Sequence, residues 1–137
     1  MRIAPFVALP ACLVALPVFA QPVEAPAPWR AVIEAQLEAF RADDVAGAFT
    51  FAAPGIAAQF GGPDAFGEMV RRGYPMVMDN AEVAFLDGEM IGAQYAQPVL
   101  LTDAAGRLHR LVYVMEETPD GWRIAGVSLM GTAGTDA

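Results

Sequence analysis

The hydrophobic pattern of the chain is helical in the first half and extended in the second. Over residues 29–42, apolar side chains recur at helical spacing and form one face, made of Trp29, Val32, Ile33, Leu37 and Phe40. The pattern predicts a short second helix over 45–51 and a third over 64–72. The connector at 56–62 has no clear pattern. The apolar segment at 74–78 contains a proline that prevents simple continuation of the third helix.

Residues beyond position 80 have the composition and turn signals of β-strands. We expect strands at 82–86, 89–102, 107–117 and 122–130, separated by turns at Asp87–Gly88, Asp103–Gly106 and Thr118–Gly121. Pro98 has no amide hydrogen for a strand ladder, so a bulge or kink is expected near it. The fold class is therefore α+β, with three N-terminal helices on one face of a four-stranded antiparallel sheet.

The last two strands form a long hairpin at the centre of the fold. A three-residue loop at 119–121 would place Thr118 opposite Trp122 and Glu117 opposite Arg123, an ion pair that supports this register. Counting from that turn puts one set of residues toward the helices: Val112, Val114, Trp122, Ile124, Gly126, Ser128 and Met130. The opposite face carries Leu111, Tyr113, Met115, Ala125, Val127 and Leu129. Both faces are mostly apolar, so both are expected to be covered.

The first residues have the pattern of a secretory signal peptide. A short positive start precedes an apolar run, and Val18-Phe19-Ala20 places small residues at the −3 and −1 positions that signal peptidase reads, before Gln21. We expect residues 1–20 to be removed after Ala20, which predicts a periplasmic or secreted protein with no stable membrane insertion. The rest divides into a proline-rich lead-in at 21–28, one domain at 29–131 and a flexible tail at 132–137.

Composition excludes several kinds of function. The formal net charge of −8 and the pI near 4.4 argue against a nucleic-acid partner, which needs a basic face. The only cysteine, Cys12, lies in the signal segment, so the mature chain has no disulfide and no thiol chemistry. His109 is the only histidine and has no evident partner in the sequence. We expect no metal site and no cofactor.

The order of elements resembles a known superfamily. The first helix with Leu37 and Phe40, the break followed by Phe49, and the ending Asp-Gly-Trp-Arg-Ile at 120–124 are similar to the nuclear transport factor 2-like superfamily, also called SnoaL-like or cystatin-like. Within it, the block at 60–77 resembles a bacterial exported domain family of unknown function. The resemblance implies a curved sheet wrapped over helices as a cone-like, cystatin-like roll, with a pocket between the layers and frequent dimerisation through the outer sheet face.

The fold implied by the resemblance allows the pocket and the dimer face to be assigned to particular residues. A small apolar ligand would lie in a pocket lined by Phe40, Phe49, Tyr74, Trp122, Gly126 and Ser128. A homodimer would use Tyr113, Met115, Val127 and Leu129 of the outer face. The plan departs from many members because no strand pair lies between the second and third helices. The segment at 56–60 is the candidate to cover the free edge of the last strand.

Three functions stay open, and a non-catalytic small-ligand-binding or interaction domain is the leading one. The resemblance also raises an enzyme of the isomerase or cyclase type, which needs a carboxylate base in an apolar pocket. Asp43 and Asp44 are the nearest acids, although an aspartate at such a break is typical of a helix cap. The third function is a purely structural dimerising module.

Overall fold

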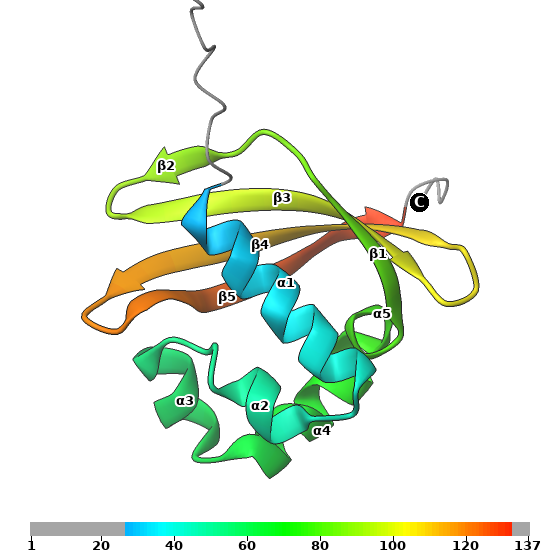
Figure 1. Cartoon of the computed structure of the whole chain (residues 1–137), viewed down its shortest axis with the longest axis horizontal. Helices are drawn as coiled ribbons and strands as arrows, with labels where there is room; N and C mark the ends of the chain where they lie inside the picture. The colour runs from blue at the N-terminus through cyan, green and yellow to red at the C-terminus, as the bar shows by residue number, and fades with distance from the viewer. Residues whose placement is uncertain (1–26, 133–137) are drawn as a thin grey trace, which may run out of the picture.

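The computed structural model describes residues 27–132 and shows two layers, with the helices on one face of an antiparallel sheet (Figure 1). The described part contains five helices: α1 (Pro28–Arg41), α2 (Val45–Phe49), α3 (Pro54–Phe60), α4 (Pro63–Gly73) and α5 (Pro75–Met78). It contains five strands: β1 (Asn80–Phe85), β2 (Glu89–Ile91), β3 (Gln94–Asp103), β4 (Leu108–Thr118) and β5 (Gly121–Thr132). The predicted α+β class is confirmed. The predicted signal peptide lies outside the described residues, as does nearly all of the predicted tail.

Proline begins most of the helices. Pro28, Pro54, Pro63 and Pro75 occupy the first turns of α1, α3, α4 and α5. Proline suits that place because its fixed φ matches the helix and an amide hydrogen there would have no partner within the helix. The sequence patterns missed α3 and α5, which are short and carry little or no helical periodicity. Each of these extra helices starts at a proline, and the one that begins α5 lies in the segment where the sequence predicted only an interruption of the third helix.

The first two strands of the sheet do not form the hairpin that was predicted at Asp87 and Gly88. β1 and β2 do not pair with each other, because both lie along the same edge of β3. The hairpin turn instead falls at residues 92–93, where Gly92 adopts φ +61. Gly88 lies in the link between β1 and β2, where an added Cβ would sit 2.1 Å from the Ala96 carbonyl oxygen. That close approach requires glycine and explains the Asp-Gly sequence without a turn.

The hairpin between β4 and β5 has a tighter turn than predicted. Thr118 pairs with Gly121 and Glu116 with Arg123, so the predicted opposition of Glu117 and Arg123 is wrong by one residue. A register shift between β4 residues 114 and 115 adds one residue to β5 at Ala125. Beyond this bulge, Val114 pairs with Gly126, which is the predicted pairing. The extra residue was therefore expected at the turn and lies within the strand instead.

Much of this hairpin faces the opposite way to the sequence prediction, whereas Trp122 and Ile124 lie on the helix side as predicted. Leu111, Tyr113 and Met115 are 0% exposed and pack in the core with Ile33 and Leu37 of α1. Ser128, which was predicted to face the helices, is exposed opposite Val112. The burial therefore corrects the dimer-face assignment, because Tyr113 and Met115 lie beneath the helices and cannot form an outer surface. The bulge also brings Ile124 and Val127 to the inner face, although they are an odd number of residues apart.

The edge of β5 is partly covered by the segment between α2 and α3. Ile124 donates its amide hydrogen to the Phe51 carbonyl at 2.8 Å and accepts one from the Ala53 amide at 2.8 Å. This short parallel bridge satisfies one stretch of an otherwise free strand edge. The sequence predicted that residues 56–60 would cover this edge. They form most of α3, which begins just after the bridge. The bridge fixes α3 beside β5 and so positions one wall of the cavity described next.

Candidate functional site

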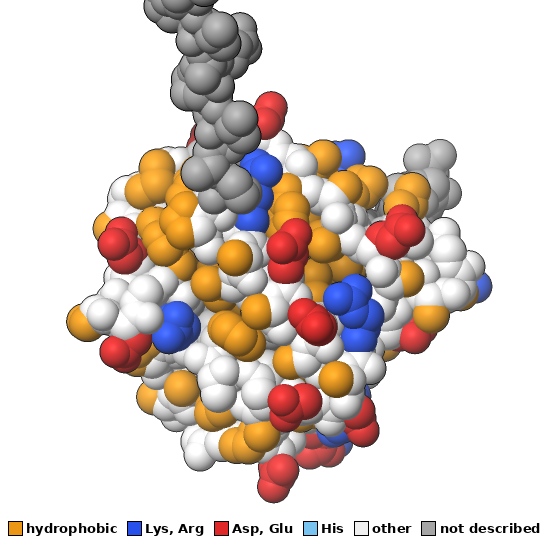
Figure 2. Space-filling model, in the orientation of Figure 1, with side chains coloured by type: hydrophobic (Ala, Val, Ile, Leu, Met, Phe, Trp, Pro, Cys, Tyr) orange, Lys and Arg blue, Asp and Glu red, His pale blue; other side chains and the backbone are white. Residues whose placement is uncertain are grey.

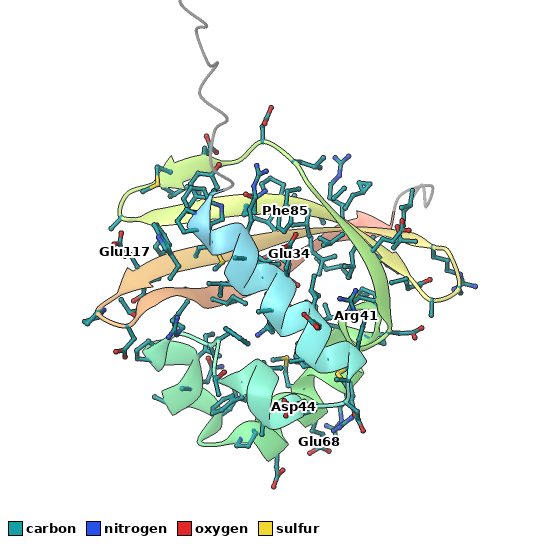
Figure 3. The ribbon with its side chains drawn as sticks, viewed as in Figure 1. Glu34, Arg41, Asp44, Glu68, Phe85 and Glu117 are labelled. Atoms are coloured by element: carbon teal, nitrogen blue, oxygen red, sulfur yellow. The ribbon has the colours of Figure 1, made fainter. Side chains whose placement is uncertain are left out.

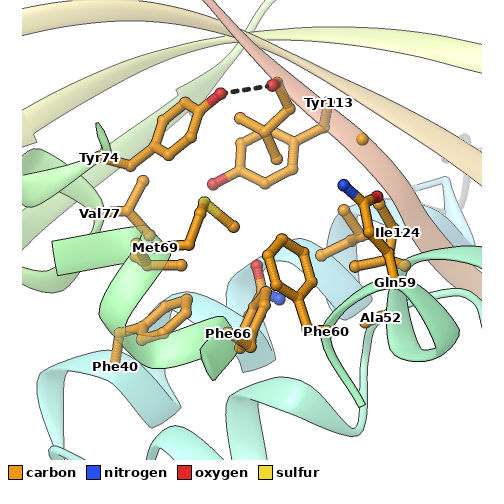
Figure 4. A pocket seen from close by; sticks show the side chains of 15 residues that line it. Phe40, Ala52, Gln59, Phe60, Phe66, Met69, Tyr74, Val77, Tyr113 and Ile124 are labelled. Atoms are coloured by element: carbon orange, nitrogen blue, oxygen red, sulfur yellow. Dashed lines mark hydrogen bonds between the residues drawn. The ribbon is translucent and has the colours of Figure 1, made fainter. Parts of the chain in front are cut away.

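A cavity of about 330 Å³ lies between the helical layer and the inner face of the sheet (Figure 4). This volume is at the lower end of the range of small-molecule sites in proteins, about 300–1,000 Å³. The wall is mostly apolar, and α1, α3, α4, α5 and the sheet each contribute to it apolar side chains that include Phe40, Phe60, Phe66, Met69, Val77 and Ile124. The wall therefore offers mainly apolar contacts to anything that enters the cavity.

Aromatic contacts hold the floor of the cavity in place. The ring of Phe66 on α4 lies 6.1 Å from that of Phe40 on α1 and 5.9 Å from that of Phe60 on α3, measured between centroids. Helical spacing puts Phe66, Met69 and Val70 on one side of α4, toward the sheet. Three helices thus meet around Phe66 and together form the floor of the cavity.

Tyr74 closes one side of the cavity and links the two layers. Its hydroxyl donates a hydrogen bond to the Val127 carbonyl at 2.9 Å, drawn as the dashed line in Figure 4. Tyr74 lies between the end of α4 and the start of α5, so this bond holds the junction of two helices on β5. Its polar group is therefore already satisfied by the protein.

Tyr113 is different, because its hydroxyl is buried without a partner. The residue is 0% exposed and lies on the cavity wall, and among the described residues no group hydrogen-bonds to its hydroxyl. Burial raises the pKa of this hydroxyl well above its usual range, so the group is a neutral phenol at any physiological pH. A neutral phenol can donate one hydrogen bond and accept another.

Two glutamine side chains complete the polar part of the wall. Gln36 of α1 is 3% exposed, and its Nε2 donates to the Ala48 carbonyl at 3.1 Å, which ties α1 to α2. Gln59 of α3 is exposed and marks the side of the cavity that faces solvent. No charged side chain lines the cavity within the part of the chain that the structure describes.

The structure brings together only some of the predicted pocket residues. Phe40, Tyr74 and Gly126 lie on the cavity wall. Phe49 packs behind the wall, with its ring centroid 5.3 Å from that of Phe66. Trp122 packs on Trp29 at 5.1 Å, outside the cavity. Ser128, on the outer face, is likewise outside the cavity. Tyr113 was missed, because the face of β4 was assigned from a register that placed the bulge at the turn.

The candidate catalytic acids lie outside the cavity. Asp44 accepts a hydrogen bond from the Gly47 amide at 3.0 Å and so caps α2, on the side of the molecule away from the sheet (Figure 3). Asp43 is exposed and adopts φ +56, a left-handed conformation that ends the first helix. Both aspartates therefore shape a turn between helices. The structure gives no support to a mechanism in which either one acts as a base in an apolar pocket.

His109 has a partner that the sequence did not reveal. Its Nε2 lies 2.8 Å from Oδ2 of Asp103, across the turn between β3 and β4, and both side chains are largely buried. The other oxygen of Asp103 accepts hydrogen bonds from the amides of Ala105 and Arg107, each at 2.9 Å. The His109 bond, followed by these amide bonds, lowers the pKa of Asp103 below its ordinary 3.8. The pair closes the turn and lies away from the cavity.

Three other kinds of feature could indicate a function in the described region: metal sites, membrane-spanning helices and clusters of basic side chains. Residues 27–130 contain no group of three or more histidine, cysteine or acidic side chains placed to hold a metal ion. None of the described helices is long and apolar enough to cross a membrane. On the face drawn in Figure 2, the arginine side chains are separated from one another and lie among acidic ones. The cavity is therefore the candidate functional site of the described domain.

Fold and cavity together define a class: an α+β domain that holds an apolar cavity between a helical layer and an antiparallel sheet. A family model described as "Domain of unknown function (DUF4864)" matches residues 23–137. The match spans most of the chain, so the chain belongs to this family. No protein with a curated description matches the chain in sequence.

Proposed function

We propose that this domain binds a small, mostly apolar molecule in the cavity between its two layers. The observation that carries the proposal is the cavity of about 330 Å³, walled by phenylalanine, methionine and branched side chains. A filled core would pack these groups against one another, because protein interiors are nearly as dense as organic crystals. Binding, rather than catalysis, is favoured because the wall presents no carboxylate, imidazole or thiol.

We also propose that the domain is a member of the nuclear transport factor 2-like superfamily. Support comes from the helices lying on one face of an antiparallel sheet, with the cavity between them (Figure 1). The ending at 120–124 then forms the start of β5, next to the turn. A solved structure of the chain, superposed on members of the superfamily, tests this placement through the order and direction of the strands.

The binding proposal can be tested with N-phenyl-1-naphthylamine, an uncharged dye whose fluorescence rises in apolar surroundings. We expect saturable binding to the purified chain. Met69→Trp places a larger side chain on the cavity wall and should abolish the signal. Met90→Trp is the matched control, because Met90 is 57% exposed on β2 and lies outside the cavity. Equal dye binding by the two folded variants would contradict the proposal.

We further propose that the protein acts outside the cytoplasm. The signal-peptide pattern of the first 20 residues supports export, with cleavage between Ala20 and Gln21. Mass spectrometry of the protein recovered from the periplasmic or culture fraction of an expressing bacterium should give a chain that starts at Gln21. A full-length chain that starts at Met1 and remains in the cytoplasmic fraction would contradict export.

A further inference from the structure

We propose that the ligand of the cavity carries an uncharged oxygen, of the ketone or similar carbonyl type, that accepts a hydrogen bond from the Tyr113 hydroxyl. The rest of the ligand is apolar and lies against the phenylalanine floor formed by Phe40, Phe60 and Phe66. This inference rests on the proposed binding function and adds the chemical class of the molecule bound. It assigns to Tyr113 the role of the residue that orients the ligand.

The position of the Tyr113 hydroxyl is fixed by the sheet. Tyr113 lies in the middle of β4, between Gln97 of β3 and Val127 of β5, and its residue surface is 0% exposed. The ring extends from the sheet into the space between the layers, where Figure 4 shows it beside Tyr74 and Met69. The side chain cannot turn to reach bulk water without disrupting the core. Whatever satisfies this hydroxyl must therefore enter the cavity.

The contrast with Tyr74 indicates that the free hydroxyl of Tyr113 is a feature of the site. Both tyrosines line the same cavity, yet the Tyr74 hydroxyl donates to the Val127 carbonyl at 2.9 Å. Buried hydroxyls in folded proteins nearly always have a partner, since leaving one unpaired destabilises the folded state. Two other buried polar atoms, Nε of Arg30 and Oδ1 of Asn80, are also unpartnered, but neither residue lies on the cavity wall. Among the residues that the structure describes, only Tyr113 joins a buried, unpaired hydroxyl to a space that can hold a ligand.

The wall also limits the charge of the ligand. No arginine, aspartate or glutamate lines the cavity in the described structure, so an ionised ligand group would be buried without a counter-charge. The buried phenol stays protonated and has a hydrogen to donate. A neutral acceptor oxygen fits both conditions. One such oxygen on an apolar body matches a wall whose buried, unpaired hydroxyl, among the described residues, is surrounded by aromatic and aliphatic side chains.

A pair of compounds with the same shape tests the inference. 2-Acetylnaphthalene carries a carbonyl oxygen, and 2-isopropenylnaphthalene carries a CH₂ group in its place. Their dissociation constants are measured by calorimetry on the wild type and on Tyr113→Phe. We expect the substitution to weaken binding of the ketone relative to the alkene by about 3- to 10-fold, the usual effect of one net hydrogen bond. Comparing the ratio of dissociation constants removes the difference in hydrophobicity between the compounds.

Tyr95→Phe is the matched control. It removes the same atom from a half-buried tyrosine that packs on Trp29, away from the cavity, so the ratio should not change. An unchanged ratio in Tyr113→Phe would overturn the inference and leave the binding function standing, provided that both compounds still bind. If neither compound nor the naphthylamine dye binds the wild type, the binding function itself fails. The two failures are therefore distinguishable.

Discussion

The hydroxyl of Tyr74 donates to the Val127 carbonyl at 2.9 Å, whereas the hydroxyl of Tyr113, the strand partner of Val127, is buried with no partner in the described structure. Two phenols on one cavity wall thus have opposite roles. The first joins the helical layer to the sheet. For the second we propose a partner in a bound molecule, and this difference leads to a prediction about stability in the absence of ligand.

Removing the two hydroxyls should affect stability differently. Tyr74→Phe deletes a hydrogen bond between layers and should lower the free energy of unfolding by about 1 kcal/mol. Tyr113→Phe deletes an unpaired buried hydroxyl and should leave the free energy of unfolding unchanged or raise it by up to about 1 kcal/mol. Urea denaturation of the ligand-free proteins measures both. A loss of stability in Tyr113→Phe as large as that in Tyr74→Phe would show that the hydroxyl has a structural partner.

Gln97 is a second point at which the layers are joined. It is 0% exposed, its oxygen accepts from the Trp29 indole at 2.9 Å, and its amide nitrogen donates to the Leu86 carbonyl at 2.7 Å. Gln97→Leu removes both bonds and leaves two partly buried partners unpaired, so we expect a loss of about 2 kcal/mol in unfolding free energy. Gln94→Leu, at an exposed site on the same strand, should change it by less than about 0.5 kcal/mol.

The Asp103–His109 pair should make stability depend on pH. The pKa of Asp103 is lower in the folded chain than its ordinary 3.8. A carboxylate with a lowered folded pKa contributes stability above its unfolded pKa, and that contribution is lost as pH falls through the folded pKa. Thermal unfolding should therefore show Asp103→Asn less stable than wild type at pH 7, with the difference shrinking below about pH 4. Asp120→Asn, at the exposed turn between β4 and β5, should show no such change. A constant difference between Asp103→Asn and wild type from pH 7 to pH 3 would contradict this account.

Gly88 should tolerate no side chain. An added Cβ would lie 2.1 Å from the Ala96 carbonyl oxygen, a backbone atom that cannot move aside easily. We expect Gly88→Ala to lower the free energy of unfolding by more than about 1 kcal/mol. Gly55 of α3 has no atom within 4 Å of an added Cβ, so Gly55→Ala should be neutral or stabilising. Equal denaturation midpoints for the two variants would show that the link between β1 and β2 can shift.

The class of the fold could be predicted from the sequence because the hydrophobic periodicity and the turn residues indicate its main elements. The apolar face of α1 and the turn at 103–106 are local signals, and both lie where they were expected. The helices α3 and α5 were missed because four to seven residues are too few to show a helical period. Short helices of this kind form because tertiary packing holds them, and packing cannot be inferred from such short stretches.

The candidate site was harder to predict because it depends on the position of one bulge. Moving the extra residue of β5 from the turn to Ala125 changes which residues of β4 and β5 share a face. The prediction that placed this residue at the turn also placed Tyr113 on the outer face. Phe40 was found because it belongs to the apolar face of α1. The unpaired hydroxyl could not be found from the sequence, since it is defined by the absence of a neighbour in space.

The most direct test is to observe where a bound molecule lies. Met69 lines the cavity and Met90 is exposed on β2, so methyl-labelled methionines report on both places. In an NMR experiment with 2-acetylnaphthalene, we predict intermolecular nuclear Overhauser effects to the Met69 methyl group and none to that of Met90. Effects at Met90 without effects at Met69 would place the compound on the surface and contradict the proposal of a ligand-binding cavity.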